Sequence, residues 1–215
     1  MLVMIPHSVF KAMNDGLHGA RAWGCGLAVS LFILTVSVGS ANAAAPSITS
    51  LSVSSGPVGT SVTITGTNFG SPQGTSYVKV NGATVTTYSS WSTTSIKIQV
   101  PAAATTSGNV VVTVTNQGSS NGKPFTVTPA ITSLSLTTGP QKMGFVISGT
   151  TFGATQGSST AMIGTTALTV EPGGWSSTAI TVQVPTTAAT GSVVVTVANN
   201  ASNSKTFTVA TYGCP

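Results

Sequence analysis

The sequence predicts an all-β chain in which two tandem β-sandwich domains follow a removable N-terminal leader. Three observations predict this fold. Apolar residues alternate with Ser and Thr after residue 45, as is typical of half-buried strands. Clusters of Gly, Pro and Asn separate the alternating runs, and no run has a helical period. The same series of motifs also occurs twice, about 83 residues apart.

Residues 1–43 are predicted to be a secretory signal peptide. Lys11 and Arg21 precede a 14-residue apolar run at 25–38, and the run is followed by Ala41-Asn-Ala43. A positive start, a short apolar middle and an A-x-A ending are typical of such a leader, so we expect cleavage after Ala43 and export of the remainder.

Three points about the leader stay open: whether it is cleaved, where translation starts and where cleavage falls. An uncleaved membrane anchor is disfavoured because the apolar run is shorter than the ~20 residues that cross a bilayer, and no membrane span is expected after cleavage. Translation could begin at either of two methionines, and cleavage could fall one or two residues later. These alternative positions are Met1 and Met13 for the start and Ala44 and Ala45 for cleavage.

The part of the chain after Ala43 repeats itself. Ile48-Thr-Ser-Leu-Ser recurs from Ile131, and Gly66-Thr-Asn-Phe-Gly recurs, with Thr in place of Asn, from Gly149, both at an offset of 83. A period this long fits tandem domains better than a solenoid. Further matching pairs are Trp91 and Trp175, Pro101 and Pro185, and Phe125 and Phe207.

Each repeat is expected to form about seven short strands. Val62 and Ile64 alternate with polar residues, and so do Ile96, Ile98 and Val100. One apolar face and one Ser/Thr face per strand predict a two-sheet sandwich. The expected organisation is a first domain at 46–128, a second domain at 130–210 and a short tail at 211–215.

The ordered motifs of the first repeat resemble those of the IPT/TIG family, which has an immunoglobulin-like fold. They are Gly56-Pro57, Gly66-Thr-Asn-Phe-Gly70, Val78-x-Val80-Asn-Gly82, Trp91, Ile96-x-Ile98-x-Val100-Pro101, Gly108-x-Val110-x-Val112 and Phe125-x-Val127. The resemblance implies a scaffold that reads DNA in transcription factors, contacts partners in receptors and builds envelope architecture in exported bacterial proteins. A fold alone does not assign one of these roles.

The second repeat departs from this pattern at its turns. Lys142-Met143 stands where the first repeat has Gly59-Thr60, Thr151 stands for Asn68, and Gly164-Thr165 stands for Asn81-Gly82. These differences bear on the shape of the loops more than on the fold.

The composition argues against catalysis. Only 4% of the chain is charged, against ~25% in ordinary soluble domains. No Asp, His or Arg follows Ala43, and Glu171 is the single acid there, so a metal cage, a carboxylate dyad and a Ser-His-Asp triad are excluded. No catalytic residue, metal site or cofactor is therefore expected, and Glu171 is expected at an exposed turn.

The remaining positive charges are scattered. Without arginine, which dominates guanine recognition, and with export, no nucleic-acid partner is expected. The five lysines are Lys79, Lys97, Lys123, Lys142 and Lys205.

Five aromatic positions and one cysteine are the candidates for binding. Phe69 and Phe152 are interpreted as buried plugs at a corner of each sandwich, with a ligand-stacking ring as the alternative. Trp91 and Trp175 occupy matching polar segments, with Tyr88 beside the first only. Packing over the sandwich edge, with the indole N–H on a backbone carbonyl, is favoured; stacking on a sugar ring by Trp91, Tyr88 and Trp175 is the alternative.

Cys214 is the one cysteine after the leader. An unpaired thiol in an exported chain suggests an intermolecular disulfide, and a frayed terminus without a role is the equal alternative.

The sequence therefore predicts a non-catalytic, exported structural, adhesive or protein-interaction module of two immunoglobulin-like domains. The alternative is a carbohydrate-binding accessory module. The expected partner is an unidentified protein or an envelope or extracellular polysaccharide. The surface is rich in hydroxyls, with 36 Thr and 25 Ser after Ala43, and lacks the charge repulsion that keeps proteins apart.

Overall fold

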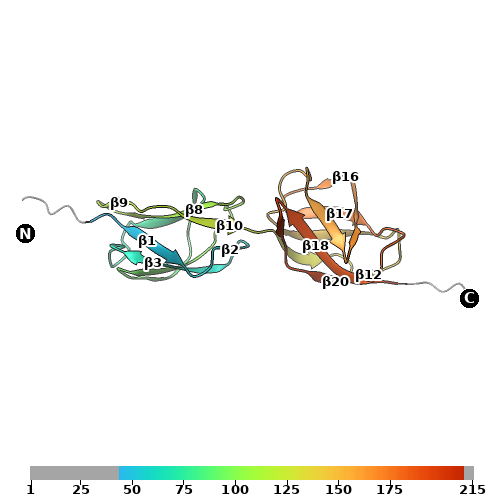
Figure 1. Ribbon diagram of the computed structural model, residues 1–215, viewed down its shortest axis with the longest axis horizontal. Helices are drawn as coiled ribbons and strands as arrows, with labels where there is room; N and C mark the ends of the chain where they lie inside the picture. Colours follow the sequence, from blue (N-terminus) through green and yellow to red (C-terminus); the bar gives the residue numbers. More distant parts are fainter. Residues whose placement is uncertain (1–43, 211–215) are drawn as a thin grey trace, which may run out of the picture. The chain divides into compact units, whose positions relative to one another are not determined.

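The computed structural model describes residues 44–210. The predicted signal peptide and the Cys214 tail lie outside the described residues, so cleavage at Ala43 and the Cys214 disulfide stay predictions. Within 44–210 every regular element is a strand (Figure 1), and no helix there is long and apolar enough to cross a membrane.

The first sandwich is built from ten strands in two sheets. One sheet has the order β1-β3-β7-β6, and the other has the order β2-β10-β8-β4-β5 with β9 beside β8. Seven of the strands have at least four residues, as the sequence predicts. The strands are β1 (Ser47–Leu51), β2 (Ser55–Gly56), β3 (Ser61–Thr67), β4 (Tyr77–Val80), β5 (Ala83–Thr84), β6 (Tyr88–Trp91), β7 (Ser95–Gln99), β8 (Gly108–Val114), β9 (Gly118–Ser119) and β10 (Lys123–Val127).

The second sandwich repeats this topology strand for strand. Its sheets have the orders β11-β13-β17-β16 and β12-β20-β18-β14-β15, with β19 beside β18. The predicted all-β fold of two tandem sandwiches is therefore confirmed. The strands are β11 (Ala130–Leu134), β12 (Thr138–Gly139), β13 (Gly144–Thr150), β14 (Thr160–Ile163), β15 (Thr166–Ala167), β16 (Thr169–Trp175), β17 (Ala179–Gln183), β18 (Gly191–Val197), β19 (Asn200–Ala201) and β20 (Lys205–Val209).

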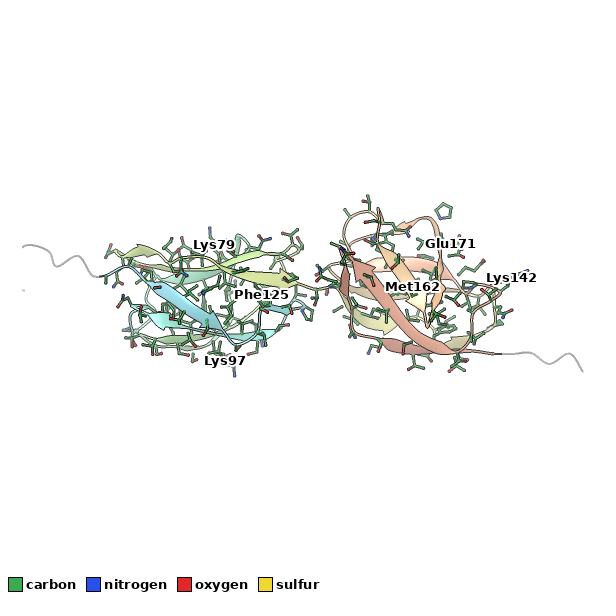
Figure 2. The ribbon with its side chains drawn as sticks, viewed as in Figure 1. Lys79, Lys97, Phe125, Lys142, Met162 and Glu171 are labelled. Atoms are coloured by element: carbon green, nitrogen blue, oxygen red, sulfur yellow. The ribbon has the colours of Figure 1, made fainter. Side chains whose placement is uncertain are left out.

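The alternating pattern puts the β-branched residues between the sheets. In β7, Ile96 and Ile98 are fully buried, while Lys97 between them is exposed. Figure 2 shows Lys97 and Lys79 on opposite outer faces of the first sandwich, with Phe125 between the sheets. Burial of these side chains is the main stabilising contribution in each domain.

The Gly-Thr-Asn-Phe-Gly motif forms the corner plug that the sequence predicts. Phe69 and Phe152 are fully buried. A Cβ on Gly66 would overlap Ser47 O and the Phe69 ring, so this position requires glycine. Asn68 follows at a positive φ of 60°, a conformation that Asn tolerates better than most residues.

An asparagine ties the two sheets of each sandwich together. Asn121 accepts a hydrogen bond from Ile48 N–H (2.7 Å) and donates one to Ile48 O (3.0 Å). Asn203 makes the same pair of bonds with Ile131 at 2.8 and 2.9 Å. The side-chain amide thus pairs with β1 or β11 as a neighbouring strand would.

Candidate functional site

Both tryptophans use their polar atom inside their own domain. Trp91 ends β6, and its Nε1–H donates to Phe69 O (3.1 Å) and Gly70 O (3.0 Å). Trp175 ends β16, and its Nε1–H donates to Phe152 O (3.0 Å). The prediction that each indole packs over the sandwich edge with its N–H on a backbone carbonyl is therefore confirmed.

The two tryptophans differ in how much of the ring meets solvent. Trp175 is only 9% exposed and belongs to the core of the second domain. Trp91 is half-buried and packs against the core of the first domain from outside. A ligand ring therefore has less indole surface to stack on at Trp175 than at Trp91.

Tyr88 closes the edge of the first sandwich. Its ring packs edge-to-face on Trp91, with the ring centroids 5.5 Å apart and the planes at 64°. Its hydroxyl oxygen accepts a hydrogen bond from Val78 N–H (2.9 Å), which lies in the opposite sheet. Burial raises the pKa of the Tyr88 phenol above its ordinary value, while the hydrogen bond from Val78 acts in the opposite direction. Tyr88 thus bridges the two sheets beside the tryptophan.

The second domain has a valine where the first has this tyrosine. Tyr88 pairs with Ile98 across β6 and β7, and Val170 holds the same register position, opposite Val182, across β16 and β17. Valine cannot span the gap between the sheets. Ala161 N–H, the counterpart of Val78 N–H, meets no side-chain acceptor among residues 44–210.

A hollow of about 340 Å³ lies beside Trp175 at this edge of the second sandwich. It is lined by Thr155, Gln156, Val170, the segment 171–173 and Trp175. That segment belongs to the Glu171-Pro-Gly-Gly174 stretch, two residues longer than the Ser89-Ser90 stretch that joins Tyr88 to Trp91. The register of β16 is interrupted between Val170 and Trp175, and Gly173 has a positive φ of 69°. The insertion therefore bulges out of the strand and forms one wall of the hollow.

Glu171, the single acid after Ala43, forms part of this wall. The expectation of an exposed turn residue was wrong, because Glu171 is partly buried and lies within β16. No lysine pairs with it in the part of the chain that the structure describes. The amide of Gln156 is nearby in the same lining, where its Nε2–H donates to Ser159 O (3.2 Å).

The lysines do not gather into a site. Lys79 Nζ lies 5.7 Å from the Tyr77 ring centroid, and Lys97 lies on the opposite sheet of the same domain. Lys142 and Lys205 are exposed on the second domain, and Lys123 is half-buried in the first. Within residues 44–210 no three His, Cys, Asp or Glu side chains are grouped as metal ligands.

The fold defines a tandem pair of immunoglobulin-like sandwiches that present strand edges, loops and hollows to solvent. The IPT/TIG domain model matches residues 46–127 and again residues 129–209. The chain belongs to the IPT/TIG family.

Several solved structures resemble the chain. SGBP-B from a complex xyloglucan utilization locus in Bacteroides uniformis is 21% identical, with 74% of this chain and 48% of that chain covered and a TM-score of 0.31. A surface glycan-binding protein from Prevotella bryantii is 14% identical, with 75% and 41% covered and a TM-score of 0.42. The plexin A4 extracellular region is 20% identical, with 86% and 20% covered and a TM-score of 0.38.

These structural likenesses are remote. The chain spans less than half of the length of each of these three proteins. Their identities and TM-scores give no basis for assigning their ligands to this chain. No curated protein matches it.

Proposed function

We propose that the protein is an exported, non-catalytic interaction module that acts at the cell surface, in the periplasm or outside the cell. The observation that carries this proposal is the placement of the few reactive side chains. Between residues 44 and 210 they are five dispersed lysines and Glu171, and Glu171 faces a hollow without a second titratable group in its lining. General acid–base and nucleophilic catalysis need a positioned pair of such groups.

Binding then uses what the sandwiches offer, namely edges, loops and a hydroxyl-rich surface. The outer strand β16 carries Pro172, which cannot donate a backbone hydrogen bond and so discourages strand addition at that position. The edge that contains β16 is therefore suited to side-chain recognition in the hollow.

Export and partner capture test the proposal together. N-terminal sequencing of the protein recovered outside the cytoplasm should begin at Ala44, and the immobilised chain should retain one defined component of the native envelope. Turnover of a substrate that follows the protein through purification and is lost in Glu171→Gln would contradict the non-catalytic assignment.

A second candidate function is carbohydrate binding, which the half-buried Tyr88 and Trp91 pair favours. Flat aromatic rings with a solvent-facing surface suit stacking on a sugar ring. Because Trp175 is 9% exposed, stacking would fall on the first domain. Titration of the Trp175→Phe variant with soluble glycans should then shift the fluorescence emission of Trp91. Emission that stays blue and resists quenchers would contradict carbohydrate binding.

A further inference from the structure

The first domain shows which group fits the position that is hollow in the second. In the first domain the phenol ring of Tyr88 packs beside Trp91, whose indole N–H donates to Phe69 O. The second domain places Val170 there and leaves about 340 Å³ open beside Trp175. We propose that this hollow binds a phenol ring supplied by a ligand.

The group that bonds the Tyr88 hydroxyl in the first domain has a counterpart that lies outside the hollow of the second. In the first domain Val78 N–H donates to the Tyr88 oxygen at 2.9 Å. Its counterpart, Ala161 N–H, lies in a residue that is 2% exposed and meets no side-chain acceptor among residues 44–210. Ala161 is not among the residues that line the hollow. A ring bound there would thus take the place of the Tyr88 ring beside the tryptophan without its hydrogen bond to the opposite sheet.

The wall of the hollow supplies the complementary acceptor. Glu171 and Gln156 both line it. Gln156 Nε2–H donates to Ser159 O, so the acceptor that Gln156 offers is its side-chain oxygen. The phenol O–H therefore donates to Glu171 or Gln156. Val170 and Trp175 provide the apolar contact for the ring.

A phenol ring can reach this site from two sources, the tyrosine side chain of a polypeptide or a free phenolic compound. The proposal rests on the proposed function, since it names the chemistry that one surface of the interaction module recognises. It does not depend on which envelope component is captured.

Two reciprocal variants test the inference. Val170→Tyr gives the second domain the residue of the first, and Tyr88→Val opens the matching space in the first domain. With p-cresol as the probe and amide NMR shifts as the readout, the wild type should respond at Val170, Trp175 and Glu171. Val170→Tyr should weaken binding at least tenfold, and Tyr88→Val should add a second set of shifts at Val78 and Trp91.

Two further probes test whether the ring hydroxyl contributes to binding and which source supplies the ring. N-acetyl-phenylalaninamide should bind about 2- to 10-fold more weakly than N-acetyl-tyrosinamide, the range expected for one hydrogen bond. Tighter binding of N-acetyl-tyrosinamide than of p-cresol indicates a polypeptide ligand, and equal binding indicates that free phenols are also accepted.

Three outcomes would overturn the inference. They are no shift with p-cresol up to its solubility, undiminished binding by folded Val170→Tyr, and no added site in folded Tyr88→Val. Circular dichroism establishes folding of both variants. If one of these outcomes rules out the phenol site but the protein still captures its partner, the proposed function stands.

Discussion

In the first domain Tyr88 fills the space beside Trp91, whereas in the second domain Val170 leaves that space open beside Trp175. Three features around this position are shared: the ladder register of the paired residues, an indole-to-carbonyl bond and the buried phenylalanine. The segment before the tryptophan differs, because it is two residues longer in the second domain. A repeated sandwich can thus keep its frame while one edge residue and a two-residue insertion decide whether the space beside the tryptophan is filled or open. The two domains therefore serve as controls for each other.

The largest expected effect is the loss of stability when the buried phenylalanine of either domain is removed. Phe69→Ala and Phe152→Ala each remove a fully buried ring, so each should lower the stability of its own domain by about 3–5 kcal/mol. Calorimetry of the two variants measures this loss. Stability losses that differ by more than about 2 kcal/mol between the two variants would exceed the usual spread for one type of substitution. Such a difference would show that the two phenylalanines are not equivalent.

A smaller effect separates the two tryptophans. Trp175→Phe leaves Phe152 O without its donor at a buried site, which should cost about 1–3 kcal/mol. Trp91→Phe should cost less, because its surroundings are half-buried and water can replace the indole N–H. Chemical denaturation of both variants is the measurement, and a larger loss in Trp91→Phe would contradict the difference in burial.

The corner motifs of the two domains also differ in backbone strain. Thr151 has a positive φ of 63°, which is unfavourable for a β-branched residue, and its Oγ1 is buried without a partner. Asn68, at the same place in the first domain, has a similar φ and donates to Ala45 O (3.1 Å). Thr151→Asn should therefore stabilise the second domain by about 1 kcal/mol.

The matched control for this prediction is the reverse exchange. Asn68→Thr should destabilise the first domain by a similar amount, about 1 kcal/mol. Thermal unfolding of both variants checks the pair. A shift of the same sign in the two domains would show that the local backbone differs in more than this residue.

The smallest effect is a difference in pH dependence. Burial raises the pKa of the Tyr88 phenol above its ordinary 10.0, so the ionised form is less favourable in the folded domain than in the unfolded chain. The first domain should keep its full stability below pH 10 and lose stability as the pH rises through the raised pKa. Tyr88→Phe should remove this part of the loss, and a profile identical to the wild type above pH 10 would contradict it.

Much of the fold could be predicted from the sequence because alternation and repetition are local signals. The β-branched residues at every second position, the glycine and asparagine turns and the doubled motif define the strands and their number. The indole-to-carbonyl bond was predictable for the same reason, since both tryptophans occupy one place in the repeat.

The hollow was not predictable from those signals. An alignment by motifs pairs Trp91 with Trp175, but only the ladder register shows that Val170 replaces Tyr88 and that the longer stretch before Trp175 bulges outward. The exposed turn expected for Glu171 was wrong for this reason. The amide clamps of Asn121 and Asn203 were missed as well, although their matching places in the two repeats were a signal for them.

A crystal structure of the protein soaked with p-cresol tests most directly whether the space that Tyr88 fills in the first domain is a ligand site in the second. The ring should lie between Val170 and Trp175, with its oxygen within hydrogen-bonding distance of the Glu171 or Gln156 side chain, and the edge at Tyr88 should be unchanged. Density for p-cresol at the Tyr88 edge instead, or a hollow closed by the segment 171–174 with no ligand, would contradict the account.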